Sequence, residues 1–118
     1  MRCSYERKST IELNAYQNEA MKTAIYPVAT AIEYTALGLV SEAGEVAGKV
    51  KKMIRDNDGI LTEEFRKALM DEYSDVLWYV SEGARALGYS LDAVAAHNLN
   101  KLADRQKRGV LQGSGDSR

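Results

Sequence analysis

The sequence contains few residues of several types, and each shortage excludes a class of protein. Among its 118 residues are one cysteine, Cys3, and one histidine, His97, which excludes an internal disulfide and a zinc site built from three or four His or Cys ligands. A single cysteine also favours a reducing, cytoplasmic compartment. No apolar run approaches the roughly 20 residues of a membrane span, and the first residues lack the apolar stretch of a signal peptide.

An excess of charge of one sign is absent as well. The 16 Lys and Arg residues nearly balance the 17 Asp and Glu residues, leaving a net charge of −1. This balance argues against a general nucleic-acid binder. The length fits one domain over residues 1–118, large enough to bury one core. We therefore expect a soluble, cytoplasmic single domain with neither a nucleic-acid nor a membrane partner.

The residues that are abundant predict an all-α fold. Pro27 is the only proline, and the chain is otherwise rich in the helix-forming residues Ala, Leu, Glu and Lys. We expect helices over residues 11–24, 29–55, 63–87 and 91–108, with Thr62 and Ser90 as N-caps. Short connections predict a compact, four-helix bundle-like arrangement, completed by association with further copies. The glycine-rich residues 109–118 are expected to form a flexible tail.

Two pairs of acidic residues stand three positions apart, Glu42 with Glu45 and Glu72 with Asp75. About two such pairs would arise by chance, so their surroundings carry the argument. Five other acids precede a Lys or Arg by three or four residues and are expected on solvated helix faces: Glu19, Glu63, Glu64, Glu82 and Asp104. Of the two pairs, only Glu45 has such a neighbour, Lys49. The other three border an apolar stripe without a local counter-charge.

Unpaired carboxylates beside a core require a compensating positive charge. Two antiparallel helices that each offer two carboxylates one turn apart predict a divalent cation with oxygen ligands, which suits Mg²⁺ or Mn²⁺. A di-iron carboxylate bundle needs Glu-x-x-His on two helices. The single His97, with Val94 three residues earlier, does not supply it. Two pairs of ordinary surface acids remain the alternative interpretation.

Longer stretches around these acids resemble a known family. The segments EAGE at residues 42–45 and EYSD at 72–75 resemble an ExxE…ExxD signature, within the longer runs GLVSEAGEVAGKVKK and DEYSDVLWYV. Asn98, Lys101, Leu102 and Arg105 resemble an NxxKLxxR segment, and RGVLQGSGDSR resembles the tail of single-domain members. Over about residues 12–118 the chain thus resembles the MazG-like nucleotide pyrophosphohydrolases of the all-α NTP pyrophosphatase superfamily.

The resemblance implies Mg²⁺-dependent hydrolysis of a (deoxy)nucleoside triphosphate to the monophosphate and pyrophosphate, as in house-cleaning of nucleotide pools. It implies four metal ligands: Glu42, Glu45, Glu72 and Asp75. Glu42 or Glu45 is the expected catalytic base that accepts a proton from water. Substrate contacts are expected from Lys49, Tyr79, Asn98, Lys101 and Arg105. A homodimer or homotetramer is implied as well, and we expect the active site to form near its interface.

Two other functions remain open. A phosphoribosyl-ATP pyrophosphohydrolase of histidine synthesis shares the helical scaffold and the acidic motifs. A helical oligomerisation module could hold a metal structurally, without catalysis. The basic residues also admit a plain solvated-face interpretation, Tyr79 could simply pack in the core, and Gln17 is expected to be an exposed polar residue of the first helix. The preferred base and sugar are not predicted.

Overall fold

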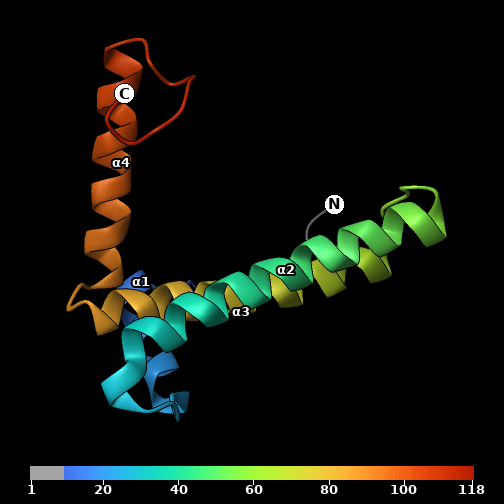
Figure 1. Ribbon diagram of the computed structural model, residues 1–118, viewed down its shortest axis with the longest axis horizontal. Helices are drawn as coiled ribbons and strands as arrows, with labels where there is room; N and C mark the ends of the chain where they lie inside the picture. Colours follow the sequence, from blue (N-terminus) through green and yellow to red (C-terminus); the bar gives the residue numbers. More distant parts are fainter. Residues whose placement is uncertain (1–9) are drawn as a thin grey trace.

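The computed structural model describes residues 10–118 and confirms an all-α fold with four α-helices (Figure 1). They are α1 (Leu13–Ala20), α2 (Ala31–Asn57), α3 (Glu63–Ala86) and α4 (Leu91–Lys107). Short 3₁₀ turns, η2 (Met21–Thr23) and η3 (Val28–Thr30), lie between α1 and α2. The expected first helix over residues 11–24 is therefore shorter, because its last turn tightens into η2. None of the described helices is both long and apolar enough to cross a membrane.

Local sequence signals set the ends of the long helices. The hairpin turn between α2 and α3 uses left-handed backbone at Asp58 (φ 53°) and Gly59 (φ 72°). The Thr62 hydroxyl accepts a hydrogen bond from the Phe65 amide at 3.2 Å, and the Ser90 hydroxyl accepts one from the Ala93 amide at 3.1 Å. Both predicted N-caps are thus confirmed. The short turn makes α2 and α3 antiparallel neighbours along their whole length.

Helix α4 does not pack along this hairpin. It leaves the end of α3 and points away from it, so the chain has two arms, the α2–α3 hairpin and α4 (Figure 1). The radius of gyration is 17.0 Å, against about 13 Å for a compact domain of this length. The expectation of a compact arrangement is therefore wrong for the isolated chain. The connection between α3 and α4 is short, yet α4 does not fold back along the hairpin. Side chains of α1 bind to the α3–α4 corner instead.

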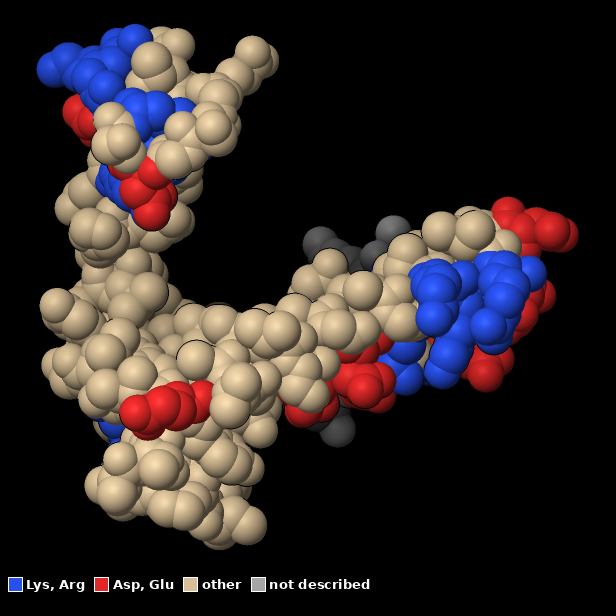
Figure 2. All heavy atoms as spheres, viewed as in Figure 1, with Lys and Arg blue, Asp and Glu red and all other residues tan. Residues whose placement is uncertain are grey.

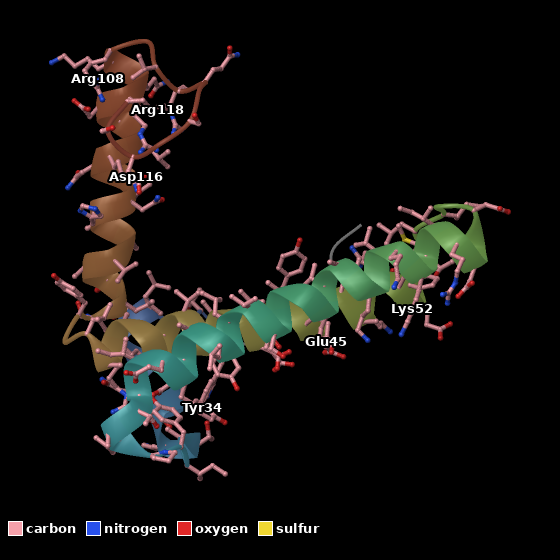
Figure 3. All side chains as sticks on the ribbon, in the orientation of Figure 1. Tyr34, Glu45, Lys52, Arg108, Asp116 and Arg118 are labelled. Atoms are coloured by element: carbon pink, nitrogen blue, oxygen red, sulfur yellow. The ribbon has the colours of Figure 1, made fainter. Side chains whose placement is uncertain are left out.

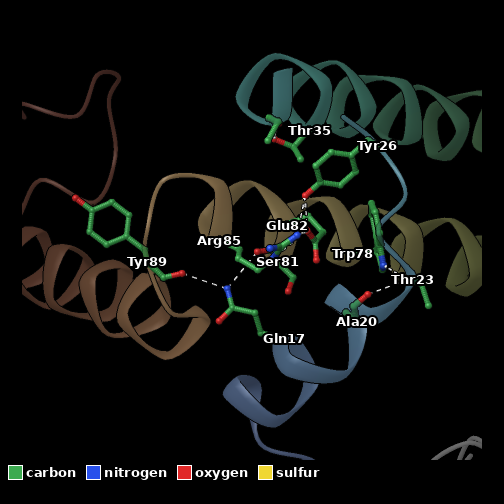
Figure 4. Close-up of polar contacts among 11 residues, drawn as sticks. Gln17, Ala20, Thr23, Tyr26, Thr35, Trp78, Ser81, Glu82, Arg85 and Tyr89 are labelled. Atoms are coloured by element: carbon green, nitrogen blue, oxygen red, sulfur yellow. Dashed lines mark hydrogen bonds and ion pairs between the residues drawn. The ribbon is translucent and has the colours of Figure 1, made fainter. Parts of the chain in front are cut away.

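Side chains of α1 fix that corner. The Gln17 amide nitrogen donates to the main-chain carbonyls of Ser81 (3.2 Å) and Tyr89 (3.1 Å), and its oxygen accepts from the Leu91 amide (3.0 Å; Figure 4). The Asn14 side chain accepts from the Asp92 amide at 2.9 Å. Gln17 is 7% exposed, so the expectation of an exposed polar residue is wrong. Helix α1 thus supplies hydrogen-bond acceptors to the first turn of α4.

The single chain leaves much apolar surface uncovered. On α2, Leu37 and Val40 are 73% and 71% exposed, and on α4 Leu99 is 66% exposed. Figure 2 shows a largely uncharged surface over the corner and the adjoining half of the hairpin. Large apolar side chains thus remain exposed on both arms of the single chain.

Candidate metal and phosphate site

Three of the four predicted ligands meet across the hairpin. Glu42 lies on α2, and Glu72 and Asp75 lie one turn apart on α3. Each offers a carboxylate oxygen, and these oxygens lie within 4.8 Å of one another. We call these three residues the acidic cluster. Glu45 is outside that group of three, although it stands one turn beyond Glu42 on α2. Figure 3 labels it in the middle of the hairpin.

Mutual repulsion within the cluster is visible at Glu42. Burial raises the pKa of this half-buried carboxyl above its usual value, and the charges of Asp75, Glu72 and Glu45 raise it further. A hydrogen bond with Glu72 also raises the pKa of Glu42. Each of the other three predicted ligands therefore opposes ionisation of this one. A cation bound among these carboxylates would instead favour the ionised form of Glu42 and lower its pKa.

Lys49 compensates part of this negative charge. Its ammonium nitrogen lies 3.2 Å from a carboxylate oxygen of Glu72, and the two side chains are 33% and 15% exposed. The sequence suggested Glu45, one turn earlier on α2, as the partner of Lys49. The actual partner lies on α3, so Glu72 does have a counter-charge. Spacing along one helix does not reveal partners on another.

Tyr79 lies close to the acidic cluster, against α2. A methyl group added at Gly38 would overlap the Tyr79 ring, so glycine is required there for the ring to reach the helix. The ring packs edge-on against Trp78 with centroids 4.9 Å apart, and at a tilt against Tyr34 at 6.4 Å. Burial raises the pKa of the Tyr79 hydroxyl, as do Tyr34, Glu42 and Asp75. The hydroxyl therefore keeps its proton at neutral pH, and a hydrogen bond with Tyr34 engages it in this structure.

Tyr16 brings α1 into the same neighbourhood. Burial raises the pKa of its hydroxyl, and the charges of Asp75 and Glu82 raise it further. Sequence patterns alone do not single out Tyr16, Tyr34 or Gly38 as site residues. Their positions inside or near the motif runs were the only indication of a role at the site. Aromatic residues at helical spacing, such as the two tyrosines, are typical of any core.

Glu82 lies on α3, two turns beyond Asp75, and is fully buried (0% exposed). Arg85 approaches it at 2.6 Å, and the Tyr26 hydroxyl donates a hydrogen bond to it (Figure 4). The expectation of a solvated face at Glu82 is therefore wrong. The three side chains fasten the α1–α2 connection to α3, which gives this carboxylate a structural role.

The remaining predicted substrate contacts lie on the other arm. Asn98, Lys101 and Arg105 are all on α4. Lys101 and Arg105, which we call the basic pair, contact Asp116 of the tail, residues 109–118, at 3.3 Å and 3.0 Å. Figure 3 labels Asp116 on the α4 arm, well away from Glu45. Lys101 is ten residues beyond Leu91, which places it about 15 Å along α4 from the corner. One chain therefore does not bring the basic pair to the acidic cluster.

Comparisons with known proteins agree with the motif arrangement. Residues 30–110 match the MazG nucleotide pyrophosphohydrolase domain, a stretch that contains the acidic cluster and the basic pair. The chain is 48% identical over 114 residues to the Gene 37 protein of Mycobacterium phage L5, a match that covers 92% of this chain and all of the relative. No solved structure matches. By the extent of the domain match, the chain belongs to the family of MazG nucleotide pyrophosphohydrolase domains.

Proposed function

We propose that this protein hydrolyses nucleoside triphosphates to the monophosphate and pyrophosphate in a Mg²⁺-dependent reaction, with Mn²⁺ as a possible substitute. The observation that carries the proposal is the convergence of Glu42, Glu72 and Asp75 oxygens within 4.8 Å, inside a MazG domain. A cytoplasmic location and a house-cleaning role in nucleotide pools belong to the same proposal.

The donor set suits a small, hard cation. Two oxygens on one Mg²⁺ lie about 3.0 Å apart when adjacent and about 4.2 Å apart when opposite, so the three carboxylates would have to draw closer together to share one ion. All three donors are carboxylates, with no sulfur or nitrogen ligand that would favour zinc. When bound, the cation would neutralise phosphate oxygens and lower the pKa of water at the site.

The positions of the four acids divide their roles. Glu42, Glu72 and Asp75 would hold the cation, whereas Glu45, one turn beyond Glu42, would stay free to accept a proton from the attacking water. Lys49 already lies at the edge of the cluster and would neutralise a substrate oxygen or keep Glu72 oriented. The Tyr79 hydroxyl would donate to a phosphate oxygen.

We propose further that a second copy supplies α4 to the acidic cluster. Asn98, Lys101 and Arg105 would then contact the triphosphate held by the hairpin of the partner subunit. The exposed apolar residues Leu37 and Val40 on α2 support such a homodimer or a dimer of dimers. Sedimentation should show an oligomer at micromolar concentration that Leu37→Glu dissociates. The same change at Ile54, near the hairpin tip, serves as a control, and a monomeric wild-type protein would contradict the proposal.

Pyrophosphate release from a nucleotide panel tests the activity itself. The panel contains NTPs, dNTPs, oxidised and methylated analogues, and phosphoribosyl-ATP, each with Mg²⁺ and with excess chelator. We expect metal-dependent release from at least one nucleoside triphosphate. Release from phosphoribosyl-ATP alone would favour the histidine-synthesis enzyme. Release from none would favour a structural module.

A further inference from the structure

The tail forms a closed loop on α4 (Figures 1 and 3). The Arg118 guanidinium donates to main-chain carbonyls of the tail itself, at 3.2, 3.4 and 2.7 Å: Val110, Leu111 and Gly115. Arg108 of the α4 C-cap donates to the main-chain oxygen of Arg118 at 2.6 Å. Glycines with positive φ allow the reversals of the chain at positions 109, 113 and 115. These contacts return residue 116 to the side of α4.

The loop places one carboxylate oxygen between the two cations of the basic pair. The same oxygen of Asp116 lies 3.3 Å from the Lys101 ammonium and 3.0 Å from the Arg105 guanidinium. Hydrogen bonds from Arg105 and Lys101, and their charges, lower the pKa of Asp116. The Asp116 side chain is 87% exposed, whereas that of Arg105 is 7% exposed. A buried cation thus faces a solvent-exposed anion, which another anion can replace from solution.

Asp116 leaves part of the Arg105 guanidinium without a partner. Its Nη2 atom reaches Asp116, but its Nε atom is buried and has no acceptor among the described residues. A guanidinium presents five donors in a planar fork that suits two oxygens of a phosphate. A phosphate group carries more charge and more acceptor oxygens than a carboxylate. The basic pair therefore suits a phosphate group better than the carboxylate that it holds.

We propose that the tail is a displaceable strap, in which Asp116 occupies the phosphate position on Lys101 and Arg105 until a polyphosphate expels it. The assignment of that phosphate to a nucleotide substrate rests on the proposed function. The strap itself is a competitor within the chain. It lowers the apparent affinity for phosphate by the fraction of molecules in which the site is closed.

Calorimetric titration with inorganic pyrophosphate, without divalent metal, tests the strap. Asp116→Asn should bind pyrophosphate about fivefold more tightly than the wild type, the gain expected from removing one exposed ion-pair competitor. The matched control is Asp104→Asn. It removes the same charge from α4, where Asp104 pairs with Arg108 at 2.8 Å, and it should give a smaller change. The double variant Lys101→Ala/Arg105→Ala should lose binding.

A second readout follows the tail directly. In the wild type, pyrophosphate should shift the amide resonances of Gly113 and Gly115 toward those of unstructured glycine. In Asp116→Asn, the same resonances should already have these positions before pyrophosphate is added. Equal or weaker binding by Asp116→Asn than by Asp104→Asn would overturn the strap. No binding by any variant would overturn the anion site as well. Since neither readout requires metal or hydrolysis, a failed nucleotide assay would leave this result standing, and the reverse also holds.

Discussion

The hairpin and the α4 arm both concentrate charge, but they compensate it differently. In the hairpin, three carboxylates converge with Lys49 as a partial counter-charge, and the pKa of Glu42 is raised. On α4, two cations already hold an anion of their own chain, and the pKa of Asp116 is lowered. The acidic cluster of the hairpin is therefore short of positive charge, whereas the basic pair on α4 is already occupied by Asp116 of the same chain. We infer that the hairpin is built to take up a cation and the α4 arm to exchange one anion for another.

The largest expected effect comes from removing a ligand charge in the hairpin. Asp75→Asn keeps the shape of the side chain but loses its charge, so nucleotide turnover should fall by more than about 100-fold. Stabilisation by Mg²⁺, about 2.7 kcal/mol at 100 times the dissociation constant, should also disappear. Pyrophosphate release and thermal melting with and without Mg²⁺ measure both effects.

The matched control for that prediction lies one turn earlier on the same helix. Asp71 is exposed and lies outside the acidic cluster, so Asp71→Asn should retain turnover and the Mg²⁺-dependent rise in melting temperature. If the two variants behaved alike, charge on α3 in general would matter, and the cluster would lose its assignment.

A smaller effect is expected from the contact that places Tyr79 beside the cluster. Gly38→Ala would force the ring away from α2 and should destabilise the protein by about 1–3 kcal/mol, as overpacking does. Gly44→Ala on the same helix meets nothing within 4 Å and should instead stabilise it by up to about 1 kcal/mol. Denaturant unfolding without metal measures both free energies. Changes of the same sign would show that the Tyr79 packing is not as described.

The smallest expected effect separates repulsion from ligation at one residue. In metal-free protein at neutral pH, Glu42→Gln should raise the melting temperature slightly, because an ionised carboxylate with a raised pKa opposes folding. With saturating Mg²⁺ the order should reverse, since only the wild type gains a full ligand set. A variant that is less stable in both conditions would show that Glu42 serves packing rather than metal binding.

Local sequence patterns predicted those features that depend on one helix at a time. The spacing of Glu72 and Asp75, and the N-caps Thr62 and Ser90, are readable along a single segment. Partners across helices were not readable, because they depend on the register between helices. For that reason the spacing along α2 places Lys49 beside Glu45, whereas its ion-pair partner is Glu72 on α3.

The burial of polar side chains that serve the fold is also not visible in local sequence patterns. Glu82 and Gln17 have the pattern of exposed helix residues, yet both are buried and hydrogen-bonded to distant segments. The Gln17 contacts hold the corner from which α4 starts, so the direction of α4 could not be predicted from the lengths of the connections. The position of the basic pair relative to the acidic cluster depends on that direction.

Subunit complementation tests most directly the claim that the hairpin of one chain works with α4 of another. Asp75→Asn disables the hairpin, Lys101→Ala/Arg105→Ala disables α4, and each variant alone should be inactive. Because mixed dimers restore one intact site, an equilibrated equimolar mixture should recover about one quarter of wild-type specific activity. A mixture of Asp75→Asn with Glu72→Gln, both in the hairpin, should recover none. If the first mixture is no more active than its separate components, the two-chain active site is contradicted.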